Sequence, residues 1–400
     1  MKGPHFSVII PTYNRAHLLP LAVQSVLAQS FEDFEIVISD GASTDNTQEV
    51  VKAIGDDRIR YFSTSEKVPV GENYQNGLNQ ATGEYITFLS DDDAYTPELL
   101  GRVKEVIERE KAEIVGYPYC RYYHDDLYDF ERNIPKNSLL ISKFDGRVTK
   151  FSSAEALDQV FALHGLRGGP VDPRFICPYL SNATYHRSIF DRLRKVRENL
   201  FDMVPPDIYL AAAVFYMVES YHCLDEPLLV WSNWEGNATA SAQRTENKIR
   251  DHYERLLNGK ELAHTPLKFA LAMNCGANAI LEAASGLGNG LADVDWVTYF
   301  VRTYENFIYL KSVGVNTERE EAEFVVVIKC QPEEIRSKVQ KEISGMLFSA
   351  KAFLNSRMPG VAAKMRKVLN RRALDEMKVV EGRKAGFSNV ADASRCVLNA

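Results

Sequence analysis

Three adjacent carboxylates, Asp91, Asp92 and Asp93, directly follow an apolar run of the chain. Neighbouring carboxylates repel one another unless water screens them or a positive charge lies among them. Two or three carboxylates suit a hard divalent cation such as Mg²⁺ or Mn²⁺, which keeps part of its water shell and readily takes phosphate oxygens. The triplet therefore indicates either a solvated acidic turn, which aspartate also favours, or a cation site that bridges to a diphosphate.

Two other polar loops also follow apolar runs. The segment 12–15 (TYNR) follows the β-branched run 6–10, and Asp40 ends the run 34–40. Further strand patterns occupy 58–64 and 83–89, and apolar residues recur at helical spacing in 16–30, 47–54 and 71–82. This alternation predicts an α/β fold, a mostly parallel sheet with helices on both faces and with ligands at the carboxyl ends of the strands. The three loops should therefore converge on one cleft.

Several stretches of the chain, in this order, resemble the family 2 inverting glycosyltransferases, which have the nucleotide-sugar-binding GT-A fold. The strongest are SVIIPTYNRAHLLPLAVQSVLAQ, FEIVISDGASTDNT and NYQNGLNQATGEYITFLSDDDAYTPELL, followed more weakly by SNATYHRSIFDRL and PPDIYLA. The resemblance implies a GT-A domain over residues 1–237. It also implies a hexosyltransferase that moves a sugar from a nucleotide-diphosphate donor to a glycan or lipid-linked acceptor, with inversion, in cell-surface polysaccharide synthesis.

The resemblance implies roles for individual residues. Pro11, Thr12 and Tyr13 would line the nucleotide base and ribose, Arg15 would lie near the phosphates, and Asp40 would accept a hydrogen bond from the base. The complete set of implied donor-binding residues is Pro11, Thr12, Tyr13, Arg15, Asp40, Asn73, Asp91 and Asp92. The implied ligands of Mn²⁺ or Mg²⁺ are Asp91 and Asp93.

Asp207, in PPDIYLA, occupies the position where the family often has its catalytic base. A general base would take the proton of the acceptor hydroxyl as the new bond forms. An acid after two prolines in the first turn of a helix also interacts favourably with the helix dipole, so a purely structural role competes with catalysis.

The sequence departs from the family pattern at several positions. Ser39 replaces the first acid of the family's DDGS motif, Ala42 is an apparent insertion, and Gln75 stands where many members have arginine. No RxH segment follows Trp231, so no histidine metal ligand is predicted. Trp231 and Trp234 would either stack on a sugar ring or pack against the C-terminal helices, and the second interpretation is favoured.

Residues 238–400 are expected to be mainly helical and to provide acceptor, oligomer or membrane-surface contacts. Apolar residues recur at helical spacing in 242–284 and 294–310, whereas the apolar run 324–330 is ambiguous, and residues 121–178 show an irregular pattern. The segment 346–372 has seven Lys or Arg and no acid. It would either contact an anionic membrane peripherally or form a solvated basic helix.

Composition narrows the class of protein. A formal net charge of −7 argues against a nucleic acid as partner. The six cysteines are scattered without a metal-like spacing, which favours free, mostly buried thiols in a reducing compartment. No signal peptide or membrane-spanning run is apparent, so the expected location is cytoplasmic, with the inner membrane face as the place of any peripheral contact.

Two alternative functions remain beside sugar transfer. A nucleotidyltransferase shares the metal chemistry, but it would carry a glycine-rich basic loop after the first strand, which PTYNRAHL is not. A non-catalytic sugar-binding or scaffold subunit of a glycan-assembly complex would have no need of the acids Asp40, Asp92 and Asp207.

Overall fold

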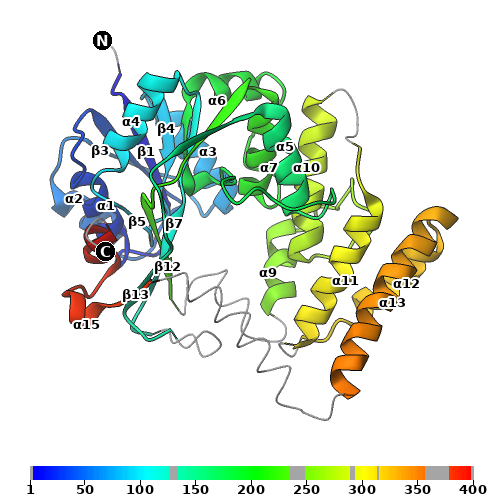
Figure 1. Cartoon of the computed structure of the whole chain (residues 1–400). Coiled ribbons are helices and arrows are strands. Elements are labelled where there is room, and N and C mark those ends of the chain that lie inside the picture. Colours follow the sequence, from blue (N-terminus) through cyan, green and yellow to red (C-terminus); the bar gives the residue numbers. More distant parts are fainter. Residues whose placement is uncertain are drawn as a thin grey trace.

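The computed structural model describes residues 3–126, 134–234, 248–288, 293–312, 315–355 and 378–397. Its N-terminal part contains two β-sheets with flanking helices, and helices predominate in its C-terminal part (Figure 1). The helices of the N-terminal part are α1 (Leu19–Leu27), α2 (Thr47–Ile54), α3 (Val70–Gln80), α4 (Leu99–Glu110), α5 (Ser153–Leu163), α6 (Arg187–Arg194) and α7 (Pro206–Ala213), with short 3-10 turns at Leu180–Asn182 and Val214–Tyr216.

The larger sheet has eight strands and carries the loops that were predicted to form the site. The order is β3 (Ile59–Ser63), β2 (Phe34–Asp40), β1 (Phe6–Thr12), β4 (Tyr85–Phe88), β10 (Ala183–His186), β6 (Ile114–Gly116), β11 (Ser220–Leu224) and β9 (Val148–Ser152). The first four of these strands are parallel to one another, whereas β10 is antiparallel to both β4 and β6. The predicted parallel α/β arrangement of the first four strands is confirmed within a sheet that is mixed overall.

Strand β1 is buried at every position because helices cover both of its faces. Val8 and Ile10 belong to the apolar cluster that includes residues of α1 and α4, whereas Ile9 belongs to the cluster on the opposite face. There α3 comes so close that a Cβ at Gly77 would lie 2.5 Å from Ile9 Cγ2. Successive side chains of a strand point to opposite faces, so a strand that is covered on both sides needs a continuous apolar run.

The smaller sheet joins distant parts of the sequence. It contains, at one edge, the strand that follows the acidic turn and, at the other edge, a strand from near the end of the chain. Its order is β13 (Lys378–Glu381), β8 (Ser138–Ile141), β7 (Tyr119–Tyr123), β12 (Leu229–Asn233) and β5 (Ala94–Tyr95). After β13, the helices α15 (Gly382–Ala385) and α16 (Val390–Cys396) return to the N-terminal part, where α16 packs against α1, β5 and β12 (Figure 1).

Among the described residues, five further helices precede β13 in the C-terminal part. Helices α9 and α10 adjoin the N-terminal part: α10 packs on α7 and shares its apolar core, and Leu257 of α9 lies in an apolar cluster with Val204. Helices α12 and α13 lie at the far edge of the molecule (Figure 1). The helices are α9 (Lys248–Leu257), α10 (Ala272–Leu287), α11 (Trp296–Ser312), α12 (Glu318–Lys329) and α13 (Glu333–Asn355). None of the described helices combines the length and the apolar character that crossing a membrane requires.

The structure resolves several open points of the sequence. The ambiguous run 324–330 lies in helix α12 except for its last residue, Cys330, which caps the helix, and the irregular region 121–178 contains β8, β9 and α5. All six cysteines are free, and four of them are buried. The expected domain boundary at 237 lies outside the described residues, as do 356–372 of the basic segment.

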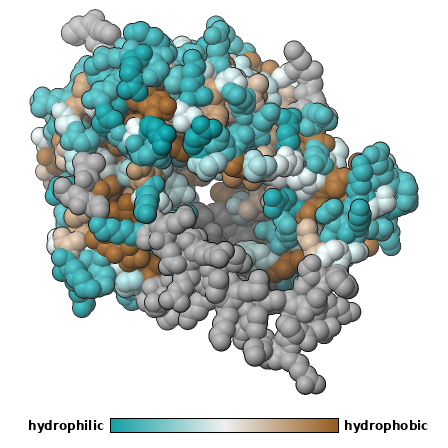
Figure 2. Space-filling view, in the orientation of Figure 1, coloured by the Kyte–Doolittle hydropathy of each residue, from teal (hydrophilic) through white to brown (hydrophobic). Residues whose placement is uncertain are grey.

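Apolar side chains reach the surface over α11 and α12, in the C-terminal part of the molecule (Figure 2). Val325 and Val326 on α12 are 50% and 62% exposed, and Ile308 on α11 is 43% exposed. Contact of the C-terminal part with an oligomer partner or a membrane stays a prediction, and this surface is one place where it could occur.

Candidate active site

A cavity of about 620 Å³ opens where β1 and β4 end. This volume lies within the range of sites for small molecules and cofactors. Of the predicted site residues, those that line it are Pro11, Thr12, Tyr13, Arg15, Asn73, Asp91, Asp92 and Asp207. Asp40 and Asp93 are not among the lining residues, so the structure brings together most of the predicted set and leaves these two behind the cavity wall.

Asp91, the first residue of the acidic turn, is held by two side chains of the loop 12–15. Its Oδ2 accepts a hydrogen bond from Thr12 Oγ1 at 2.7 Å, and its Oδ1 accepts one from Arg15 Nη1 at 2.7 Å. Burial raises the pKa of this carboxyl to about 6, against the opposing effect of the Arg15 charge. The nearby cation therefore compensates only part of the cost of removing Asp91 from water.

Asp92 shares the same guanidinium and adds an aromatic partner. Arg15 Nη1 lies 3.4 Å from Asp92 Oδ2, which also accepts a hydrogen bond from Trp234 Nε1 at 2.9 Å. The Arg15 guanidinium lies 5.5 Å from the Trp234 ring centroid, and Trp231 lines the cavity. The tryptophans thus contact the candidate site, contrary to the favoured expectation that they would pack against the C-terminal helices.

Asp93 is fully buried and only half satisfied. Its Oδ1 accepts a hydrogen bond from the Ser232 backbone N–H at 2.8 Å, whereas its Oδ2 has no hydrogen-bond partner among the described residues. Burial, with Asp92 adding its negative charge, raises the pKa of Asp93 well above its usual value. A carboxylate oxygen that is buried and unpaired costs free energy, which a cation would offset.

The acidic turn fits a divalent cation that is completed by its substrate. Within the described ranges, no group of three or more His, Cys, Asp or Glu side chains is arranged as a closed metal site. Mg²⁺ is commonly held by only one or two carboxylates together with waters and substrate phosphates. Asp91 faces the cavity, and the oxygen of Asp93 that has no hydrogen-bond partner lies in the same turn behind the cavity wall. A cation that arrives with a diphosphate would therefore meet Asp91 directly and would reach Asp93 only if this turn opens.

Asp40 holds its own loop together. Its Oδ1 accepts hydrogen bonds from the Ser43 backbone N–H at 2.9 Å and from Ser43 Oγ at 2.6 Å, and its Oδ2 accepts one from Tyr61 Oη at 2.5 Å. Only 1% of the residue is exposed. Asp40 is not among the residues that line the cavity, so the implied base contact stays a prediction.

Asn73 connects three elements behind the cavity. Its Nδ2 donates to the Thr12 carbonyl at 3.0 Å, and its Oδ1 accepts a hydrogen bond from Ser39 Oγ at 2.7 Å. Ser39 is the residue that departs from the family's acidic pair, and here its hydroxyl fixes Asn73. The substitution therefore has a structural role in shaping the wall beside Thr12.

Asp207 lies in the first turn of α7 and lines the cavity. Its Oδ1 accepts a hydrogen bond from the Ile208 backbone N–H at 3.0 Å, and burial raises its pKa above the ordinary 3.8. Burial, with a contribution from the Asp207 charge, raises the pKa of Tyr74 and Tyr253, which are neutral at pH 7. Dipole stabilisation and a catalytic role are both compatible with this position, and the cavity gives the carboxylate a surface on which to act.

Comparisons with known proteins identify part of the chain. The family model described as glycosyl transferase family 2 matches residues 7–162. This segment is a family 2 glycosyltransferase domain. It contains the first loop, Asp40 and the acidic turn, whereas Asp207 lies beyond the matched residues.

Curated relatives of this glycosyltransferase domain include two bacterial enzymes. The GalNAc(5)-diNAcBac-PP-undecaprenol beta-1,3-glucosyltransferase of Campylobacter jejuni is 38% identical over 160 residues, which are 37% of this chain and 49% of that protein. The PGL/p-HBAD biosynthesis glycosyltransferase of Mycobacterium bovis is 37% identical over 121 residues, which are 29% of this chain and 46% of that protein. The chain thus spans about half the length of these curated relatives.

A solved structure resembles the chain over most of its length. Staphylococcus aureus TarS 1–349, in complex with UDP-GlcNAc, superposes with a TM-score of 0.51 over 95% of this chain and 92% of that chain, at 16% sequence identity. At this identity the likeness shows the fold alone, which is the GT-A fold with a C-terminal helical region.

The cavity has a further wall, beyond the matched glycosyltransferase segment, that the sequence did not indicate. Tyr253 and Leu256 of α9 line the cavity together with Lys67 and Tyr74, and Lys67 Nζ lies 4.6 Å from the ring centroid of Tyr13. An apolar face of a helix far along the chain is read as core, so these two α9 side chains carried no signal for a site. Of these lining residues, Lys67 alone carried a signal in the sequence. It is a basic side chain in the loop after a strand, where a phosphate-facing group can be expected.

Proposed function

We propose that this chain is a metal-dependent inverting glycosyltransferase that uses a nucleotide-diphosphate sugar. The observation that carries the proposal is that Asp91, Asp92 and Asp207 line the same cavity as Thr12 and Tyr13. A buried carboxylate pair next to the end of a parallel strand suits a cation and a diphosphate, and a third carboxylate in the same cavity suits a general base.

The donor would bind along the first loop. Pro11, Thr12 and Tyr13 would line the base and ribose, and the charged side chains of Arg15 and Lys67 would attract the phosphates. Both side chains border the cavity. A guanidinium can donate two parallel hydrogen bonds to phosphate oxygens, which fixes the geometry of the contact.

Asp91 and Asp93 would hold the divalent cation. When it is bound, Mn²⁺ or Mg²⁺ stabilises the negative charge that develops on the departing diphosphate. In the chain itself, Thr12 and Arg15 fix the Asp91 carboxylate, and the Ser232 backbone N–H fixes that of Asp93. The orientation of Asp91 would be present before the donor binds, which lowers the cost of assembling the site.

Asp207 would act on the acceptor. The acceptor hydroxyl attacks the anomeric carbon from the face opposite the diphosphate, so that the configuration inverts, and Asp207 takes the hydroxyl proton. Burial raises the proton affinity of this carboxylate, which suits a base that must accept a proton near neutral pH. Tyr253, Leu256 and Ile208 give the same cavity an apolar side on which an acceptor sugar could lie.

The proposed acceptor is a lipid-linked glycan, and the sugar is a hexose. The name of the Campylobacter jejuni relative gives an undecaprenol-diphosphate-linked acceptor and a glucosyl group. A lipid-linked acceptor would place transfer at a membrane surface, where the basic segment 346–372 would make its predicted peripheral contact. Cell-surface polysaccharide synthesis is the pathway type that this acceptor class suits.

A thermal-shift screen of nucleotide sugars with and without Mn²⁺ tests the proposal. A ligand that binds only the folded chain raises its melting temperature, so we expect one nucleotide class to raise it more strongly with Mn²⁺ than without. The responding donor is then offered with a lipid-linked glycan, and transfer is followed by mass spectrometry. Donor binding without transfer or donor hydrolysis would favour the sugar-binding subunit, and no response to any nucleotide sugar would refute the proposed function.

A further inference from the structure

Arg197 lies in the segment between α6 and α7 that leads to Asp207. Its guanidinium forms a two-pronged contact with Asp202, from Nε to Oδ1 at 2.9 Å and from Nη2 to Oδ2 at 3.0 Å. Nε also donates to the Asn199 carbonyl at 3.2 Å. One side chain thus ties three points of a short segment immediately before α7.

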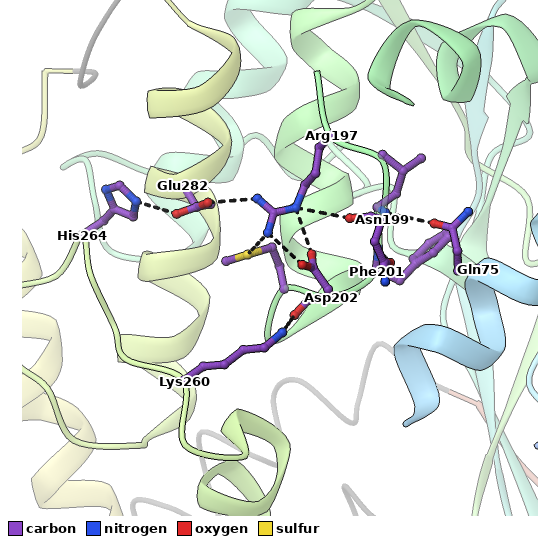
Figure 3. A network of polar contacts seen from close by, with 10 residues as sticks. Gln75, Arg197, Asn199, Phe201, Asp202, Lys260, His264 and Glu282 are labelled. Atoms are coloured by element: carbon purple, nitrogen blue, oxygen red, sulfur yellow. Dashed lines mark hydrogen bonds and ion pairs between the residues drawn. The ribbon is translucent and has the colours of Figure 1, made fainter. Parts of the chain in front are cut away.

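The same guanidinium connects this segment to the C-terminal helices (Figure 3). Arg197 Nη1 donates to Glu282 Oε1 on α10 at 3.0 Å, and Glu282 Oε2 lies 2.5 Å from His264 Nε2. The ammonium of Lys260 donates to the Asp202 carbonyl. Two separate contacts therefore hold the segment to the C-terminal part, one from Glu282 on α10 and one from Lys260 before α10.

The segment is held from the opposite side by α3, the helix that carries cavity residues. Gln75 Oε1 accepts a hydrogen bond from the Leu200 backbone N–H at 3.0 Å. The rings of Tyr74 and Phe201 lie 5.8 Å apart, and a Cβ at Gly71 would collide with the Phe201 carbonyl. Gln75, where many family members have arginine, therefore faces the segment before α7 (Figure 3).

We propose that Arg197 is a positioning residue that holds residues 198–206 so that the Asp207 carboxylate faces the cavity. The inference rests on the proposed function of Asp207. Asp207 is hydrogen-bonded to the adjacent Ile208 backbone N–H, so its carboxylate moves with the first turn of α7 and with the segment that enters it. A displacement of about 1 Å in a reacting group can cost about 100-fold in rate.

The contact requires arginine because of its planar fork. Five N–H groups in a fixed plane allow Arg197 to reach Asp202, Asn199 and Glu282 at once, and its guanidinium also lies 5.6 Å from the ring centroid of Tyr209 on α7. A lysine in this place would keep the charge and one of these contacts. We therefore expect lysine to restore part of the effect that an uncharged residue removes.

The test compares Arg197→Gln and Arg197→Lys in the full chain. We expect Arg197→Gln to lower kcat about 10- to 100-fold, with the donor dissociation constant within about twofold of the unmodified value, and Arg197→Lys to recover part of the loss. Hydrogen exchange should become faster in 198–210 and stay unchanged in 83–95. Arg174→Gln is the matched control, because Arg174 makes the same two-pronged contact with Asp172 on an exposed loop.

Glu282→Gln provides a second variant that keeps the Arg197–Asp202 contact and weakens the tie of Arg197 to α10, together with the contact between Glu282 and His264. It should produce the same pattern in a milder form, which keeps the test decisive if Arg197→Gln does not fold. Unchanged exchange in 198–210, or an unchanged kcat with faster exchange, would overturn the inference. If the unmodified chain transfers no sugar, the proposed function fails, and the exchange data still decide whether Arg197 holds the segment.

Discussion

Replacing Asp91 by Asn should change how the stability of the metal-free protein depends on pH. Burial raises the pKa of this carboxyl to about 6 in the folded chain, whereas an aspartate in the unfolded chain has its ordinary 3.8. The folded chain therefore binds the proton more tightly. The stabilisation is fully present below pH 4 and is lost as the pH rises through about 6.

The size of the effect follows from the two pKa values. Their difference corresponds to about 3 kcal/mol, of which about 2 to 3 kcal/mol falls between pH 4 and pH 7. Asn does not titrate, so the variant does not lose this stabilisation. As the pH rises from 4 to 7, the free energy of unfolding of Asp91→Asn should therefore increase by this amount relative to that of the unmodified chain. The loss of the Arg15 contact adds an offset in the free energy of unfolding without adding this slope.

Urea unfolding at a series of pH values, in the presence of a chelator, measures this difference. Adding Mn²⁺ with the responding nucleotide should stabilise the unmodified chain at pH 7 and have little effect on the variant. Asp56→Asn is the control, because hydrogen bonds from Arg58 lower the pKa of Asp56 to about 2 and its difference should stay nearly constant between pH 4 and pH 7. An Asp91→Asn protein with the same pH slope as the unmodified chain would refute the assigned burial of this carboxyl.

Three further substitutions address the base, the acceptor wall and the packing below the site. Asp207→Asn should lower kcat by about 10²- to 10⁴-fold with donor binding retained. In rate–pH profiles, the transfer rate of the unmodified chain should fall as the pH drops through the raised pKa of Asp207, and the variant should lack this fall. Tyr253→Ala should raise the KM for the acceptor and leave the donor KM unchanged in initial-rate assays; equal changes in both would contradict the assigned wall. Gly77→Ala should destabilise the chain by about 1–3 kcal/mol in urea unfolding, because its Cβ would lie 2.5 Å from Ile9 Cγ2.

The sequence predicted the part of the fold where local patterns and tertiary packing agree. Strands β1, β2 and β4 are short apolar runs ended by polar loops, and each is buried on both faces. The loops at Thr12 and Asp91 therefore met at the ends of neighbouring strands, as expected. In this region the periodicity, the loop positions and the burial all indicate the same arrangement.

The remaining parts of the site depend on contacts between distant residues. Trp234 donates to Asp92 across 142 positions of the chain, and Leu200 meets Gln75 across 125 positions. No local pattern encodes such pairings. The acidic triplet also looks uniform in sequence, although Asp91 and Asp92 line the cavity and Asp93 is fully enclosed. The direction of each side chain depends on the backbone of the turn, which the three identical residues do not reveal.

The return of residues 378–397 to the N-terminal part has a consequence for biosynthesis. While the ribosome is still translating the helices α9 to α13, the nascent chain can already assemble the parallel strands, but the edge of β8 and the apolar surface of α1, β5 and β12 await β13 and α16. An unpaired strand edge is prone to pairing with other chains. Translation that stops early would therefore release a molecule whose candidate active site is largely assembled and whose sheet edge is open to aggregation.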